Sequence, residues 1–275
     1  MTGRVTVKSV LYTTVFTIAA IVWILPLIWM AAKTFTPTAD ILRTGGSLLP
    51  TNVTLDNLSG VIRKWPFFRW MLNSAIVTSI AMIVMVTVSI LAAYSFARLK
   101  WKGRNVLFLL FLASMFVPWE INAIPLYFIM NFLGLLNTFP GVALPIAAMP
   151  IGIFLLRQFF INFPRDLEDA ARIDGCGSLR VLIQLFVPMS TPVIGALVVW
   201  VFIFGWNEFF WSMISLQGSA HLTLPIGLKA ILGAQNVEYG LLFGASFLAL
   251  CPSLIVFLLL RKRIIAGISL SGAIK

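Results

Sequence analysis

A short polar segment, residues 164–175, interrupts a chain that is otherwise almost entirely apolar. It begins with a proline, carries acids in its first part and ends in Asp174-Gly175. Proline suits the first helical turn, acids there suit the helix dipole, and glycine readily takes the left-handed conformation that ends a helix. The pattern predicts a short helix from about Arg165 to Arg172. A membrane protein would offer such a helix to a soluble partner.

The side chains of this helix favour docking. Ala170 and Ala171 leave a smooth face that can enter a groove, Glu168 and Asp169 can pair with basic residues there, and Gly175 allows a sharp exit. The sequence therefore predicts a docking helix at about 164–176, with candidate residues Glu168, Asp169, Ala170, Ala171, Asp174 and Gly175. The alternative is a solvated acidic helix in a loop, without a partner.

Two carboxylates lie inside long apolar stretches. Glu120 is followed by Asn122, and Glu208 follows Trp206 and Asn207. A charge at bilayer depth is costly unless it faces a cavity or a partner, so these side chains are candidates for a solute pathway. Trp with Asn and Glu also suits a sugar, since the indole meets the ring and the polar groups meet its hydroxyls. The alternative is that both carboxylates only pair with groups of a neighbouring subunit.

Other residues are expected to have structural positions. Trp23, Trp29 and Trp200 are expected to pack or to lie at the membrane interface, and Tyr94 and Arg98 to anchor the inner end of an apolar span.

Residues for catalysis, metal binding or ATP binding are not apparent. His221 is the single histidine, Cys176 and Cys251 are the two cysteines, and neither type forms a cluster in the sequence. No nucleophile–base pair stands out, and no G-x-x-x-x-G-K-[ST] phosphate loop occurs. The sequence predicts a protein that is not an enzyme and binds no metal or cofactor, so energy must arrive through a partner.

Composition indicates an integral membrane protein. Hydrophobic residues make up 60% of the chain and charged residues 11%, far below the charge content of a soluble domain. Six apolar stretches are long enough to cross a bilayer: residues 10–32, 71–97, 106–130, 140–161, 192–216 and 239–260. Several contain proline, which favours a packed bundle because neighbouring helices satisfy the freed carbonyl groups. The expected fold is therefore all-α with six transmembrane helices.

The distribution of basic residues predicts the orientation. With the N-terminus inside, 14 of the 20 Lys and Arg residues fall on the cytoplasmic side, which is the usual bias. Both termini are expected in the cytoplasm, with residues 1–9 and 261–275 flanking a transmembrane region at 10–260. The net charge of +11 is explained by this bias, and no nucleic-acid partner is expected.

The polar helix and its surroundings resemble a known signature. Residues 167–175 read Leu-Glu-Asp-Ala-Ala-Arg-Ile-Asp-Gly, and Leu185-Phe186-Val187-Pro188 and Pro192 follow. The succession is similar to the E-A-A…D-G…L-P…P signature of permease subunits of bacterial ABC importers. One departure is visible, because Asp169 lies between the glutamate and the two alanines.

Further segments resemble the maltose-type carbohydrate branch of these permeases. The tail at 267–275 resembles the Gly-Leu-Thr…Gly-Ala-Val-Lys ending of the shorter permease of such importers. The other matching segments follow the same order along the chain: residues 49–58, 73–74, 92–99 with 103–104, 124–127, 134–138 and 206–209.

This resemblance implies a type I importer permease in the bacterial inner membrane, taking up a sugar by alternating access. It makes residues 164–176 a coupling helix that docks on an ATPase. The implied partners are a second permease, two ATPase subunits carrying ATP and Mg, an extracellular or periplasmic solute-binding protein, and membrane lipid. A glycerol-phosphate or glycerophosphodiester importer is the alternative within the family, and a stand-alone channel or ion-coupled carrier is the alternative outside it.

Overall fold

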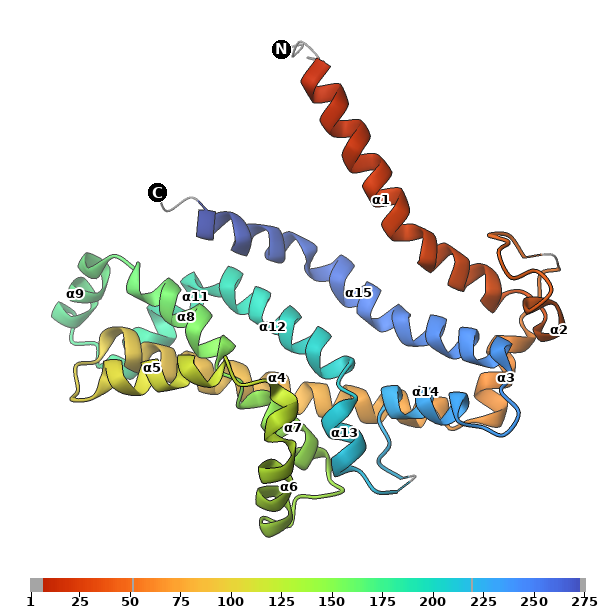
Figure 1. The fold of residues 1–275 in the computed structure, drawn as a ribbon. Helices are drawn as coiled ribbons and strands as arrows, with labels where there is room; N and C mark the ends of the chain where they lie inside the picture. Colours follow the sequence, from red (N-terminus) through yellow and green to blue (C-terminus); the bar gives the residue numbers. More distant parts are fainter. Residues whose placement is uncertain (1–6, 51, 219, 273–275) are drawn as a thin grey trace. The chain divides into compact units, whose positions relative to one another are not determined.

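The computed structural model describes residues 7–50, 52–218 and 220–272, and every regular element in these ranges is a helix (Figure 1). The predicted N-terminal segment 1–9 and tail motif 267–275 fall partly on residues 1–6 and 273–275, which lie outside the described residues. The chain divides into two compact units, Met1–Phe68 with Leu228–Cys251 and Arg69–Gly227 with Pro252–Lys275.

The expected all-helical membrane fold is confirmed in its main features. Among the described residues, four helices are long and apolar enough to cross a bilayer, and two bent helix pairs bring the possible number of spans to six. The four are Val10–Thr34 in α1 (Val7–Thr34), α4 (Phe67–Arg98), Phe139–Ile161 as α7 (Phe139–Ala147) with α8 (Ile151–Ile161), and Tyr239–Arg261 in α15 (Tyr239–Gly272).

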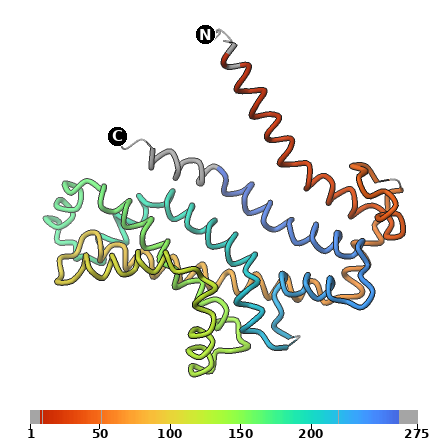
Figure 2. The backbone as a smooth tube through the Cα atoms, viewed as in Figure 1, coloured from red at the N-terminus to blue at the C-terminus, as the bar shows by residue number. Residues whose placement is uncertain are grey.

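The predicted third span, 106–130, is not one continuous helix. α5 (Arg104–Ser114) ends, and after a bend of 101° the chain resumes as a short 3-10 helix, η1 (Trp119–Asn122), which continues into α6 (Ala123–Phe132) (Figure 2). Pro118 explains the break, because proline disfavours helical geometry in the residue before it and supplies no N–H group of its own. The apolar pattern indicated the length of this span and missed its bend.

The predicted fifth span, 192–216, also differs. α12 (Thr191–Trp206) ends ten residues before the predicted boundary, and a separate short helix, α13 (Phe210–Ser215), follows. α12 is preceded by a segment bent from it by 77°, in which the backbone passes through a π-helical turn. The elements of this segment are α10 (Ser178–Val181), η2 (Leu182–Phe186) and α11 (Val187–Met189).

The larger unit has its core between α4, α7, α8 and α12. Met85, Ile146, Leu156 and Leu197 come from these four helices and are fully buried in one cluster. α8 approaches α4 closely at Gly152, where an added Cβ would lie 2.3 Å from the Ser89 Oγ. This core supports the elements that carry the candidate functional residues.

The other unit is organised by Asn57, at the start of α3 (Asp56–Lys64). Its amide donates to the carbonyl oxygens of Thr34 and Thr36 at 2.9 and 2.7 Å, and its carbonyl accepts from Thr38 in α2 (Thr38–Ile41). An added Cβ at Gly240 would lie 2.2 Å from the Asn57 Oδ1. Asn57 therefore joins the end of α1, α2 and the start of α15 through one buried side chain. α14 (Leu224–Leu232) lies at the boundary of the two units along the chain.

α13 begins at the carboxylate of Glu208. The Glu208 oxygens accept from the backbone N–H groups of Trp211 and Ser212 at 2.7 and 2.8 Å, and also from the Ser212 hydroxyl. The first turn of a helix has N–H groups with no partner inside the helix, and an acid is well suited to accept from them. Glu208 is 6% exposed, so these contacts are made away from solvent.

Removing this carboxylate is expected to lower stability. Glu208→Ala leaves buried N–H groups without acceptors, at about 1–3 kcal/mol each, while Glu208→Gln keeps one carbonyl oxygen and loses less. We expect the melting temperature of the purified membrane protein to fall in the order wild type, Gln, Ala. Glu120→Ala is the matched control, because Glu120 is exposed, and it should melt like the wild type. Equal melting of all Glu208 variants would contradict the capping assignment.

Candidate functional site

The predicted polar helix is present as α9 (Arg165–Ile173), one residue longer than expected at its C-terminal end. It ends as the sequence indicated. Gly175 has φ +79°, its N–H donates to the Arg172 carbonyl, and the N–H of Cys176 donates to the Ala171 carbonyl, both at 3.0 Å. This is the two-bond termination that glycine makes possible after a helix.

Glu168 faces the interior of its unit. Its side chain is 9% exposed, one oxygen lies 3.0 Å from the Arg98 Nε, and the other lies 2.8 Å from the Arg172 Nη2. Arg98 is at the end of α4, so the ion pair fastens α9 to that helix, and Figure 1 shows α9 at the end where α4 meets the loop to α5. Both oxygens of Glu168 are thus engaged within the chain, and its pairing with basic residues of a partner stays a prediction.

Arg98 is the structural anchor that the sequence indicated. Its Nη2 donates to the Phe163 carbonyl at 2.8 Å, and its guanidinium lies 5.2 Å from the centre of the Phe186 ring. On the exposed side, the hydrogen bond from Arg172 to Glu168 and the attraction of that carboxylate raise the pKa of Arg172. Arg172 is positively charged at physiological pH, as arginine ordinarily is.

The outward face of α9 is defined by what remains exposed. Asp169, Ala170, Asp174 and Gly175 are exposed, whereas Ala171 is half-buried against the core. The apolar residues Leu167 and Ile173 are 43% and 86% exposed, and Leu179 of α10 is 62% exposed. Sequence reasoning missed these residues, although the spacing of Leu167, Ala170 and Ile173 is an available signal for one helical face.

Of the five predicted pathway residues, Asn122 lines the cavity described below, and the other four do not. Trp206 is buried, and its ring stacks on that of Phe202 with the ring centres 5.6 Å apart. The Asn207 amide, at the end of α12, donates to the Ile203 carbonyl at 2.8 Å. Glu208 accepts from backbone N–H groups of α13, and its contact with a solute stays a prediction. Glu120 and Asn122 are both exposed in η1.

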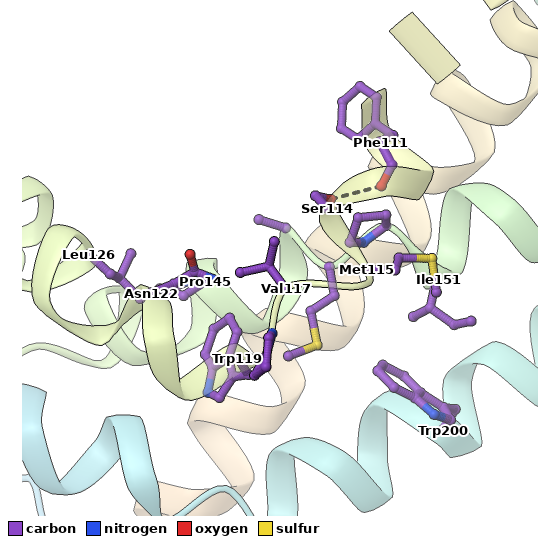
Figure 3. Close-up of a pocket in the computed structure, with 14 residues that line it drawn as sticks. Phe111, Ser114, Met115, Val117, Trp119, Asn122, Leu126, Pro145, Ile151 and Trp200 are labelled. Carbon is purple, nitrogen blue, oxygen red and sulfur yellow. Dashed lines mark hydrogen bonds between the residues drawn. The ribbon is translucent and has the colours of Figure 1, made fainter. Parts of the chain in front are cut away.

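A cavity of about 540 Å³ lies where the third span breaks. Asn122 is the predicted pathway residue that lines it, and Trp119 of η1 and Trp200 of α12 supply two indole rings (Figure 3). Trp200 was expected to be a packing residue, and it does stack on Phe204 at 5.2 Å while lining the cavity. The remaining lining residues are uncharged: Phe111, Ser114, Met115, Val117, Pro118, Leu126, Pro145, Ala148, Met149, Pro150 and Ile151.

The sequence could not indicate this cavity, because Trp119 and Trp200 are far apart in the chain and meet only through the bend after Ser114. Its chemistry is that of apolar faces with a few hydrogen-bonding groups. The Ser114 hydroxyl donates to the Phe111 carbonyl at 2.7 Å, while Asn122 presents an amide. Within the described residues, no group of three or more His, Cys, Asp or Glu side chains is placed to hold a metal ion.

The chain is similar to known proteins over nearly its whole length. Residues 85–265 match the family described as binding-protein-dependent transport system inner membrane component. The arabinooligosaccharides transport system permease protein AraQ of Halalkalibacterium halodurans is 31% identical over 269 residues, 97% of this chain and 96% of that protein. The trehalose transport system permease protein SugB of Mycobacterium tuberculosis is 31% identical over 256 residues, 92% of each chain.

The fold is also found in a solved structure. A chain in the crystal structure of a bacterial ABC transporter involved in the import of the acidic polysaccharide alginate has a TM-score of 0.85 with this one. The match covers 96% of this chain and 99% of that chain, at 20% sequence identity. The type I permease fold predicted from the sequence is therefore confirmed. This chain belongs to the binding-protein-dependent transport system inner membrane components, the multi-pass permease subunits of ABC importers.

Proposed function

We propose that this permease takes up a neutral carbohydrate by alternating access. The observation that carries the proposal is the cavity at the broken third span, which offers indole faces and an amide and has no charged side chain in its lining. Indole rings suit the apolar face of a sugar, and the amide suits its hydroxyls. The relatives named for arabinooligosaccharides and trehalose support a substrate of this class.

The same cavity argues against a phosphorylated solute. A glycerol-phosphate or glycerophosphodiester carries negative charge, and burying an anion without a cation is costly. None of the cavity residues is basic. A stand-alone channel or carrier is disfavoured by membership in a binding-protein-dependent family.

The energy for transport is proposed to arrive at α9. We assign its exposed face, including Asp169, Ala170, Asp174 and Gly175, to docking on one of two ATPase subunits, where ATP and Mg would bind. A second permease would complete the pathway through the lipid bilayer, and a solute-binding protein outside would deliver the substrate. Closure of the ATPase pair would then move α9 and shift the spans between inward-open and outward-open states.

Glu168 and Ala171 act in this proposal by holding α9 in place. The Glu168–Arg98 ion pair ties α9 to α4, and Ala171 packs against the core. Force on α9 therefore reaches α4 directly. It also reaches α12 along the chain through α10, η2 and α11.

The ion pair is tested by a double-mutant cycle. Glu168→Gln leaves Arg98 buried without its counter-charge, and Arg98→Met leaves Glu168 with Arg172 as its remaining charged partner. Breaking one side of a buried pair costs about 3–5 kcal/mol, whereas removing both charges costs less. We expect the thermal stability of the purified protein to fall in each single variant and to fall by less than the sum in the double variant. Additive losses would contradict coupling between the two residues.

The docking face is tested by reversing one exposed charge. Asp169→Lys should preserve folding, since the side chain is exposed, but should reduce the amount of ATPase that co-purifies with this chain. Asp56→Lys is the matched control at an exposed acid in the first turn of α3, predicted on the opposite side of the membrane. Normal ATPase recovery and normal transport by Asp169→Lys would refute the assignment of this face.

The cavity is tested at its amide. Asn122→Ala removes one neutral hydrogen bond to the solute, worth about 0.5–1.5 kcal/mol, so the uptake rate at low substrate should fall about 2- to 12-fold. The measurement is uptake of labelled trehalose and a labelled arabinooligosaccharide into cells or vesicles, using whichever the wild type transports. Asn131→Ala, an exposed asparagine of α6 that does not line the cavity, is the control. Equal uptake by both variants would exclude Asn122 from the pathway.

A further inference from the structure

A second, smaller cavity lies at the loop between α4 and α5. Its volume is about 270 Å³, and its lining residues are Lys100, Trp101, Gly103, Arg104, Asn105 and Val106. The charge bias of the sequence places this loop on the cytoplasmic side of the membrane. This cavity shares no lining residue with the cavity at the broken third span.

Positive charge gathers here without compensation. Lys100, Lys102 and Arg104 lie within five residues, and none takes part in an ion pair of the described residues. Arg157 of α8 adds a further cation beside α5, with its guanidinium 3.8 Å from the centre of the Phe108 ring. Four cations with no carboxylate partner favour the binding of an anion.

The backbone also supplies hydrogen-bond donors beside this cavity, because Gly103 and Arg104 at the start of α5 line it. α5 begins directly after Gly103, which has φ +85° and provides no side-chain cap for the first turn. The N–H groups of a first turn attract anions. The anion that the basic side chains favour would therefore also meet free backbone donors.

An apolar surface continues from the cavity toward the membrane interior. Trp101 packs against Phe96 at 5.6 Å, donates its indole N–H to Ser95, and is 39% exposed. Further along the chain, in α5, Val106 and Leu109 are each 65% exposed. A free phosphate ion has no apolar group to bury against such a surface, whereas a lipid has its acyl chains.

We propose that this cavity binds an anionic phospholipid of the cytoplasmic leaflet. The phosphate of its headgroup lies between Lys100, Arg104 and the first turn of α5, Trp101 lies at the level of the glycerol backbone, and the acyl chains follow the exposed side of α5. Basic pockets at the cytoplasmic ends of transmembrane helices recognise anionic headgroups by this combination of charge and depth.

The test is a lipid titration of the intact complex, purified in detergent through a tag on this chain and measured by native mass spectrometry. The probes are phosphatidylglycerol, phosphatidylcholine and inorganic phosphate. Each basic residue near the headgroup contributes about fivefold in affinity, so Lys100→Gln should weaken phosphatidylglycerol binding about fivefold and Lys100→Gln/Arg104→Gln about 25-fold. Lys8→Gln/Arg261→Gln removes the same charge from exposed positions of α1 and α15 and should bind like the wild type.

Preferential binding of phosphatidylglycerol that is lost in the double variant and kept in the control supports the proposal. Equal affinity for phosphatidylcholine would overturn it, because the site would then have no preference for negative charge. Complete displacement of phosphatidylglycerol by inorganic phosphate would also overturn it in favour of a free-anion site. Because Lys100 is exposed, its single variant should fold normally, and unchanged phosphatidylglycerol binding by that variant alone would refute the assignment.

Discussion

Polar groups of a chain in lipid must find their partners within protein, and this constraint shapes the structure of the permease. Helices satisfy most backbone groups, but the predicted spans 106–130 and 192–216 are each interrupted, and each interruption frees donors and acceptors. After α12, the freed N–H groups of α13 are met by Glu208. A carboxylate that stands out in the sequence as a solute ligand is thus used to restart a helix.

The interruption of the third span also creates the cavity that we propose for the solute. The bend after Ser114 turns η1 so that Trp119 and Asn122 line the same space as Trp200 of α12. A straight third helix would place successive side chains around its circumference and would form no such recess. Pro118 therefore shapes the site, although its side chain has no polar group to offer a solute.

At α9, the buried ion pair between Glu168 and Arg98 determines which side chains of the helix face the protein and which face outward. Glu168 is used to attach the helix to Arg98, and this leaves Asp169 and Ala170 on the exposed side. Leu167 and Ile173 remain exposed beside them, as expected of a surface that another protein covers. The proposed coupling depends on this rigidity, since a helix attached loosely would absorb the motion instead of passing it to α4.

The amino-acid sequence by itself determined the features that depend on neighbouring residues and on composition. Apolar length indicated the spans, and Pro164 with Asp174-Gly175 located α9 to within one residue, because helix starts and stops are local in origin. The resemblance of residues 167–175 to the importer signature identified the family for the same reason.

Only the tertiary structure decided where the polar side chains point. Glu168 and Glu208 are both buried. The partner of Glu168 is Arg98, 70 positions away in the sequence, and that of Glu208 is the backbone of a helix that periodicity did not predict. The cavity likewise arises from residues of α5, η1, α6, α7, α8 and α12, whose contacts follow from packing and from bends that hydrophobic patterns do not encode.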